Sequence, residues 1–165
     1  MEKTNKTYQA YIEILKRELV PAMGCTEPIA IAYCAAKARE ALGTLPDRIK
    51  VAASGNIIKN VKSVIVPNTD GRKGIEAAAA IGVLAGDANA ALEVIAHVKP
   101  EDKEKLNSYM ENTKIHVDAA QSEHVLDLIV TVWHDGDTAE VHVVNEHTNI
   151  VKISKIMRFY LKRKS

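Results

Sequence analysis

Cys25 is the residue whose type and position best suit this chain for chemistry. It lies in the stretch GCTEP, residues 24–28, directly before a segment that is predicted to be helical. The free N–H groups and the dipole at a helix N-terminus stabilise a thiolate, which is the form of cysteine that attacks electrophiles and binds metals. The stretch therefore indicates a reactive or metal-binding thiolate, or more simply a small residue packed at a helix start.

The other possible metal ligands do not form a recognisable set. Cys34 lies among alanines about two turns, or ~10 Å, into the same predicted helix, so a core position is expected and a mononuclear site shared with Cys25 is not. His142 alternates with two valines in a predicted strand, which indicates an outward-facing side chain. None of the zinc-ligand spacings occurs among the six histidines, which are His97, His116, His124, His134, His142 and His147.

Two polar segments could line a substrate pocket. The segment SGNIIKN, residues 54–60, follows a predicted strand and could offer backbone N–H groups and polar side chains to a carboxylate. The segment NEHTN, residues 145–149, lies at the end of another predicted strand. The side chains concerned are Ser54, Asn56, Lys59, Asn60, His147, Thr148 and Asn149. The alternatives are an ordinary polar loop for the first segment and a simple closure of the sheet for the second.

Hydrophobic periodicity predicts the elements that must position these residues. Helices are expected over residues 5–19, 27–42, 75–86, 88–98 and 100–113, and strands over 48–54, 63–67, 114–119, 126–134 and 138–147. Asp135-Gly136 is expected to form the turn between the last two strands. These elements predict an α+β fold in which helices pack on one face of a mainly antiparallel sheet.

Composition excludes several classes of protein. The 165 residues suit one domain, 47% of them are hydrophobic, and no apolar run approaches the ~20 residues that a membrane span needs. No N-terminal stretch has the pattern of a signal peptide, so a cytoplasmic protein is expected. Residues 1–150 carry a net charge of −5, whereas residues 151–165 contain six basic residues and no acidic one. This distribution argues against binding to nucleic acid or membrane.

Four stretches, in this order along the chain, resemble the L-cysteine desulfidase family, which is related to the α domain of the iron–sulfur L-serine dehydratases. They are PAMGCTEPIAIA, SGNIIKN, VPNTDGRKGIEAAAAIG and EHTNI, and they lie within residues 19–150. Residues 1–150 are therefore expected to correspond to the N-terminal part of such a domain. Residues 151–165 form a basic tail that is unlike the family, although Ile150, Val151, Ile153 and Ile156 could continue a strand or begin a helix.

The resemblance implies a [4Fe–4S]-dependent lyase. Such enzymes remove the β-substituent of a small amino acid and release pyruvate and ammonia, with sulfide when the substrate is cysteine. By the resemblance, Cys25 is a cluster ligand and the two polar segments line the substrate pocket, while the general base is not assigned. The alternatives are an L-serine dehydratase-like deaminase and a non-catalytic domain that binds small molecules.

Length is the main departure from the family. Its members are more than twice as long, and their other cluster cysteines lie in the C-terminal part. The resemblance therefore predicts an incomplete, truncated lyase. The chain would need a missing C-terminal half or a partner polypeptide, would not retain the cluster alone, and could form a homo-oligomer.

Overall fold

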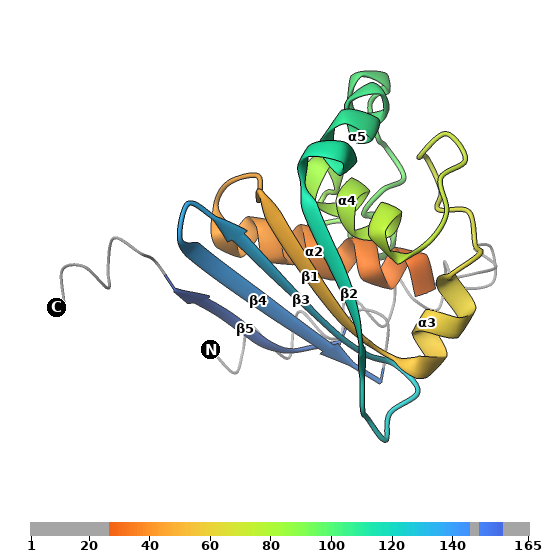
Figure 1. Ribbon diagram of the computed structural model, residues 1–165, viewed down its shortest axis with the longest axis vertical. Coiled ribbons are helices and arrows are strands. Elements are labelled where there is room, and N and C mark those ends of the chain that lie inside the picture. The colour runs from red at the N-terminus through yellow and green to blue at the C-terminus, as the bar shows by residue number, and fades with distance from the viewer. Residues whose placement is uncertain (1–26, 146–148, 157–165) are drawn as a thin grey trace, which may run out of the picture.

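The computed structural model describes residues 27–145 and 149–156 (Figure 1). The predicted helix over residues 5–19 lies outside these ranges. The described helices are α2 (Glu27–Leu42), α3 (Gly55–Val61), α4 (Ile75–Ala85) and α5 (Pro100–Asn112), with a short 3-10 helix η1 (Ala91–Glu93). The described strands are β1 (Arg48–Ser54), β2 (Lys114–Ala120), β3 (Asp127–His134), β4 (Asp137–Val144) and β5 (Ile150–Ile156).

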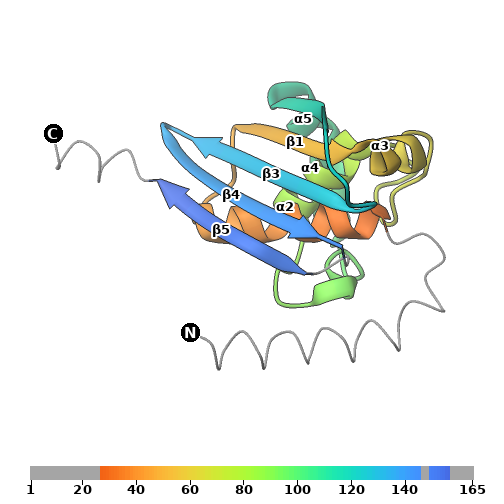
Figure 2. The same ribbon diagram turned by 90° about the horizontal axis from the view of Figure 1, so that it is seen from below.

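The strands form one sheet in the order β2-β1-β3-β4-β5. Only the β1–β2 pair is parallel, and the other described pairs are antiparallel. The β3–β4 hairpin turns at Asp135 and Gly136, whose φ angles of 49° and 90° are the positive values that a two-residue hairpin requires. The predicted α+β fold, with helices on one face of a mainly antiparallel sheet, is confirmed (Figure 2).

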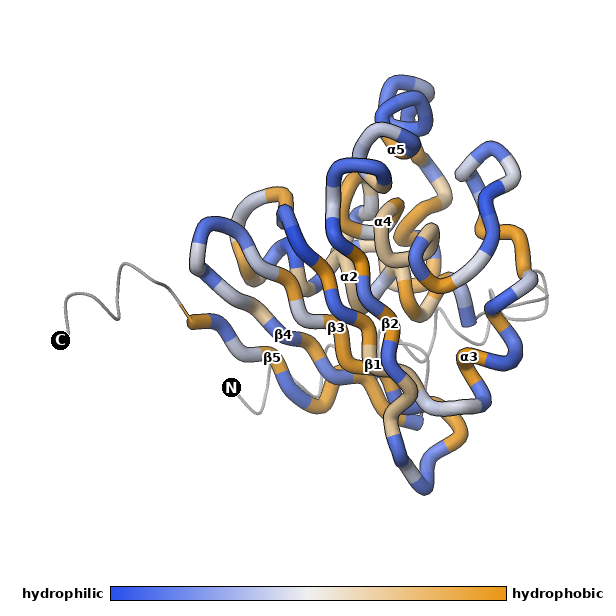
Figure 3. Tube along the Cα trace, viewed as in Figure 1, coloured by the Kyte–Doolittle hydropathy of each residue, from blue (hydrophilic) through white to orange (hydrophobic). Residues whose placement is uncertain are grey.

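One face of the sheet is apolar and packs against the helices. Alternate residues of the three central strands point to this face, so the hydropathy changes from residue to residue along each strand (Figure 3). Helix α2 runs along this face, and Ala30, Ile31 and Tyr33 on it are each 0% exposed. The buried strand residues are Ile49, Val51, Ala53, Leu128, Val130, Val132, Ala139, Val141 and Val143.

Helices α2 and α4 approach each other so closely that a glycine is needed between them. A Cβ atom at Gly82 would lie 2.4 Å from the carbonyl oxygen of Ala32 and 2.8 Å from its Cα atom. The prediction of a helix made of small residues over 75–86 is thus confirmed, and its small side chains allow this contact.

Three predicted elements differ from the structure. Residues 54–60 are mostly helical rather than a loop, because Ile57 and Val61 lie one turn apart and are both buried. Residues 63–67 form only an isolated bridge, between Ile65 and Lys73, rather than a strand of the sheet. Residues 88–98 contain only the 3-10 helix η1, since the backbone takes a left-handed φ of 49° at Ala91.

The C-terminal edge of the described sheet includes part of the predicted basic tail. Strand β5 pairs with β4 over residues 150–156, so the sheet continues beyond residue 150. The side chains of Val151, Ile153 and Ile156 are more than half exposed on this edge strand. In the part of the chain that the structure describes, no helix has the length and apolarity required to cross a membrane.

We expect β5 to be an integral part of the fold. A chain that ends at Asn149 should lose at least ~2 kcal/mol of unfolding free energy relative to a chain that ends at Ile156. The hydrogen bonds between β4 and β5 would be lost, and each contributes about 1 kcal/mol net to the free energy of unfolding. The buried side chains of Val141 and Val143 would also be uncovered. Urea unfolding followed by circular dichroism measures the difference. Equal midpoints for the two chains would show that β5 is dispensable.

Candidate functional site

Several of the predicted site segments meet at one end of the sheet. Strand β1 ends there and is followed at once by α3, while β3 begins, β4 ends and β5 begins at the same end. Helix α2 also begins at this end (Figures 1 and 2). We call this end of the sheet the α3 end, and it is defined by Ser54, Leu126, Val144 and Asn149. The topology thus brings together residues that are nearly 100 positions apart in the sequence.

Ser54 links β1 to the segment before β3. Its hydroxyl group donates a hydrogen bond of 2.7 Å to the carbonyl oxygen of Val125, and the residue is only 3% exposed. The hydroxyl does not cap α3, although Ser54 precedes that helix. Asn56, Lys59 and Asn60 are exposed on α3. Within this segment, therefore, Ser54 has a structural bond and the other three polar side chains are accessible to a ligand.

Asn149 ties the end of β4 to the start of β5. Its side-chain amide donates a 2.9 Å hydrogen bond to the carbonyl oxygen of Val144, and its own carbonyl oxygen accepts a 3.2 Å bond from the N–H of Val144. Asn145, which follows Val144 in the sequence, donates its backbone N–H to the carbonyl oxygen of Leu126. Asn149 is thereby fixed close to the start of β3. Cys25, His147 and Thr148 lie outside the described residues.

A second polar group at this end was not predicted from the sequence. His142 on β4 contacts Asp127 on β3, with 2.6 Å between Nε2 and Oδ1, and Ser122 donates a 2.6 Å hydrogen bond to Oδ2 of the same carboxylate. Burial of Asp127 opposes its ionisation, but the hydrogen bonds from Ser122 and His142 outweigh burial. As a result, the pKa of this carboxyl group lies below its usual value.

The pairing could have been found only from the strand register. His142 lies opposite Ile129, and Asp127 lies two residues before Ile129 on the same face, which makes the histidine and the aspartate diagonal neighbours. The outward direction predicted for His142 agrees with its position on the face away from the helices, since Val141 and Val143 are buried. The alternation of His142 with valines in the sequence indicates which face of the sheet His142 lies on, but it does not indicate that Asp127 is its partner.

Cys34 is a core residue, as its alanine-rich surroundings predict. Its side chain is 0% exposed, and its thiol donates a 3.3 Å hydrogen bond to the carbonyl oxygen of Val141. Burial raises the pKa of the thiol far above its usual value, so the neutral form is retained. A neutral, buried thiol is neither a nucleophile nor a metal ligand.

The described residues do not fit a four-iron cluster on their own. Iron–sulfur clusters are usually held by three or four thiolates, and the single cysteine in residues 27–145 and 149–156 is the buried Cys34. Within those ranges, no three residues of the types His, Cys, Asp and Glu are grouped so that they could hold a metal ion. Cys25, which precedes α2 by two positions, is outside them.

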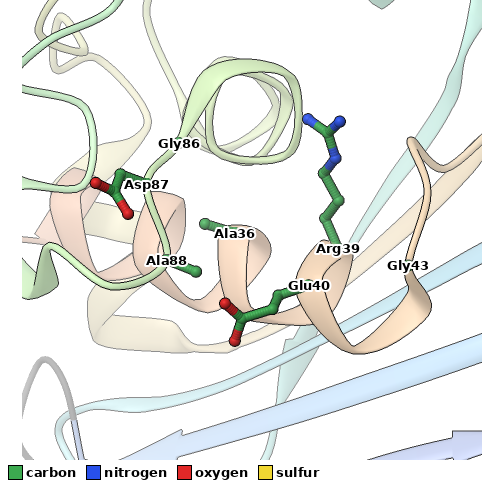
Figure 4. A pocket seen from close by; sticks show the side chains of 7 residues that line it. All are labelled: Ala36, Arg39, Glu40, Gly43, Gly86, Asp87 and Ala88. Atoms are coloured by element: carbon green, nitrogen blue, oxygen red, sulfur yellow. The ribbon is translucent and has the colours of Figure 1, made fainter.

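A pocket of about 310 Å³ lies at the opposite end of α2 (Figure 4). Arg39 does not offer its charge to this pocket, because its guanidinium group donates hydrogen bonds of 2.6 and 3.2 Å to the carbonyl oxygens of Val83 and Leu84. Glu40 is about 20 Å from Glu27 along the helix at 1.5 Å per residue. The lining residues are Ala36, Arg39, Glu40, Gly43, Gly86, Asp87 and Ala88. This pocket is therefore separate from the α3 end of the sheet.

The fold and the site thus define an α+β domain with polar groups gathered at one end of its sheet. The chain is similar to proteins named UPF0597. It is 52% identical to one from Desulfitobacterium hafniense over 94% of the chain and 36% of that relative. It is 51% identical to one from Finegoldia magna, over 88% of the chain and 35% of the relative. The relative from Treponema denticola is 44% identical over 94% of the chain and 36% of its own length.

The chain spans about a third of the length of these curated relatives. No family model matches the sequence. No solved structure matches it either.

Proposed function

We propose that this chain is the N-terminal portion of an iron–sulfur-dependent amino-acid lyase of the L-cysteine desulfidase type, acting in the cytoplasm. The reaction is the β-elimination of L-cysteine to pyruvate, ammonia and sulfide. The cluster belongs to the complete enzyme, in which Cys25 is one ligand and a further part of the protein or a partner polypeptide supplies the others. L-serine is the second candidate substrate, since the same elimination would release water from it.

The convergence of the family-like segments is the observation that carries the proposal. The start of α2, the segment from Ser54 to Asn60, and Asn149 belong to three separate stretches of the resemblance. They meet at the α3 end of the sheet rather than being scattered over the surface (Figure 2). In the sequence, Cys25 precedes α2 by two positions, and the N-terminus of a helix favours negative charge.

Charge and polarity at this end suit a small amino acid. Lys59 is exposed on α3 and can attract a carboxylate, while Asn56 and Asn60 offer amide donors and acceptors. In the 310 Å³ pocket, the charged side chains that remain available are the acidic Glu40 and Asp87, because the guanidinium group of Arg39 is bonded to backbone carbonyl groups. The carboxylate of an amino acid is therefore expected to bind at the α3 end.

We expect L-serine and L-cysteine to bind to the chain at this end. In a titration followed by backbone amide NMR, the shifts should be largest around Ser54, Leu126 and Asn149 and absent around Glu40. Lys59→Met should weaken binding about fivefold, the equivalent of ~1 kcal/mol for an exposed charge.

Lys62→Met is the matched control, because Lys62 is also exposed but lies after α3 and should leave the affinity unchanged. Shifts confined to the Glu40 region, or no saturable binding of either amino acid, would contradict the proposed function.

A further inference from the structure

The layer of helices on the apolar face of the sheet leaves the last strand without a helix of its own. Helix α4 contacts β1 and β2, whereas α2 lies mainly over β3 and β4 (Figures 1 and 2). Packed helices are about 10 Å apart and neighbouring strands about 4.8 Å apart, so one helix covers about two strands. In the described part of the chain, therefore, no helix lies mainly over β5.

The side chains of β5 reflect this lack of cover. Ile153 lies opposite Val141 of β4, and therefore on the same face of the sheet. Val141 is 0% exposed beneath α2, whereas Ile153 is 52% exposed. At the far end of β5, the Nζ atom of Lys155 lies 3.8 Å from the position that a Cβ atom on Gly43 would take, just after α2. The uncovered strip of β5 thus runs beside α2 as far as the end of that helix.

The flank of α2 on the β5 side is suited to contact with a further element. Cys34 points toward the sheet and Ala32 toward α4. Ile29, Tyr33 and Lys37 follow one another at intervals of four residues, so they share the flank that faces away from α4. Ile29 and Tyr33 are at most 1% exposed, but the Tyr33 hydroxyl has no hydrogen-bond partner among the described residues. Buried hydroxyl groups normally have a partner, which indicates that this flank is completed by polar groups beyond the described residues.

The segment before α2 has the pattern and the length to cover this strip. Its apolar residues fall on one face of the helix predicted over residues 5–19, in a stripe about 100° wide. They are Tyr8, Tyr11, Ile12, Leu15 and Leu19. A helix of these 15 residues is about 22 Å long, and the seven residues of β5 span about 23 Å. Residues 20–26 can span up to about 24 Å, which is enough for the chain to turn back beside α2.

A second copy of the chain fits this strip less well. Residues 151–165 contain six basic residues and no acidic one, and two of the six, Lys152 and Lys155, lie on β5 itself. Two such edge strands would bring like charges together if they paired, and lysines on an edge strand oppose pairing of that kind. The segment 5–19 offers an apolar stripe to the same strip and is already part of the chain.

We propose that residues 5–19 form a helix that packs over β5, antiparallel to α2. Its apolar stripe contacts Ile153 on one side and the flank of Ile29, Tyr33 and Lys37 on the other. The helix completes the layer that α2 and α4 begin, and it anchors the segment that carries Cys25 at both ends. This interaction surface does not depend on the proposed function.

Chemical cross-linking in the full 165-residue chain tests the contact. Ile153 is about 10 Å along β5 from Ile150, and Ile12 is about 10 Å along the predicted helix from Leu19, so these two isoleucines should be neighbours. Ile12→Cys and Ile153→Cys are combined with Cys25→Ala and treated with a short bismaleimide. More than half of the molecules should form a link within one chain, as peptide mass spectrometry measures.

Ala10→Cys with Ile153→Cys is the matched control, because Ala10 lies on the opposite face of the predicted helix. This pair should link in less than about a tenth of the molecules. Equal linking of the two pairs would overturn the proposal, since the stripe would not be what faces β5. Links between two chains only would overturn it in favour of a second copy.

Methyl NMR of the unsubstituted chain makes the same test without relying on the cysteine variants. A nuclear Overhauser effect is expected between the methyl groups of Ile12 and Ile153, which are assigned with Ile12→Leu and Ile153→Leu. Leu15→Asp should move the Ile153 methyl signal and lower Tm by about 5 °C or more, whereas Ala10→Asp should change both by less than half as much. A folded chain without this effect and without the cross-link would overturn the proposal. The strip would then be open to the part of the UPF0597 relatives that this chain does not span.

Discussion

Replacing Gly82 by alanine is expected to destabilise this protein by about 3 kcal/mol or to prevent it from folding. The added Cβ atom would lie 2.4 Å from the carbonyl oxygen of Ala32, which is a backbone atom of a buried helix. Relief would require α2 or α4 to move, but α2 is held between α4 and the sheet. Overpacking of a well-packed core typically costs 1–3 kcal/mol, and a clash with backbone is at the upper end of that range or beyond it.

Gly55→Ala is the matched control for this measurement. Gly55 is also a helical glycine, but a Cβ atom there would meet nothing within 4 Å. Alanine at a compatible helical position should leave stability unchanged or raise it by up to ~1 kcal/mol, because it restricts the unfolded chain. Urea unfolding of the two variants and the unsubstituted chain decides the comparison. Similar midpoints for Gly82→Ala and Gly55→Ala would show that α2 and α4 are not packed as described.

The elements with a strong local pattern could be predicted from the sequence. The apolar run from Ile29 to Ala36 gives a helix buried on nearly all sides, and the β-branched alternation around Asp135-Gly136 gives a hairpin. The Asp70-Gly71 pair is likewise typical of a turn, and both residues have positive φ. These are cases in which a few neighbouring residues determine the conformation.

The errors arose where tertiary contacts override local preference. Residues 63–67 have the composition of a strand, but they lie after α3 and outside the sheet, where Ile65 is 55% exposed. The run of alanines and valines before α5 looks helical, yet Ala91 has a left-handed backbone that interrupts it. Neither outcome can be read from periodicity alone.

The candidate site could be predicted only in part, because its contacts also depend on how distant segments pack together. The sequence indicates Ser54 and Asn149 as polar residues next to strand ends, and both lie at the α3 end of the sheet. It does not indicate that the Ser54 hydroxyl is already bonded to Val125. It also gives no sign of the Asp127–His142 pair, because the two residues are 15 positions apart and their contact depends on the β3–β4 register.

The central claim, that this chain is part of an iron–sulfur amino-acid lyase, is tested most directly by turnover. A chimera in which this chain replaces the matching third of the Desulfitobacterium hafniense relative is purified without oxygen. It is reconstituted with iron and sulfide and incubated with L-cysteine while pyruvate and sulfide are measured. The iron content and the visible absorption of a [4Fe–4S] cluster are recorded for the same sample.

We expect pyruvate and sulfide in equal amounts from the chimera, and we expect Cys25→Ala to reduce both products by at least 10³-fold with a loss of bound iron. Cys34→Ala, which removes a thiol buried in the core, should keep the iron and the activity if the variant folds. A folded chimera that releases neither pyruvate nor ammonia from L-cysteine or L-serine would contradict the account. So would full activity in the Cys25→Ala variant.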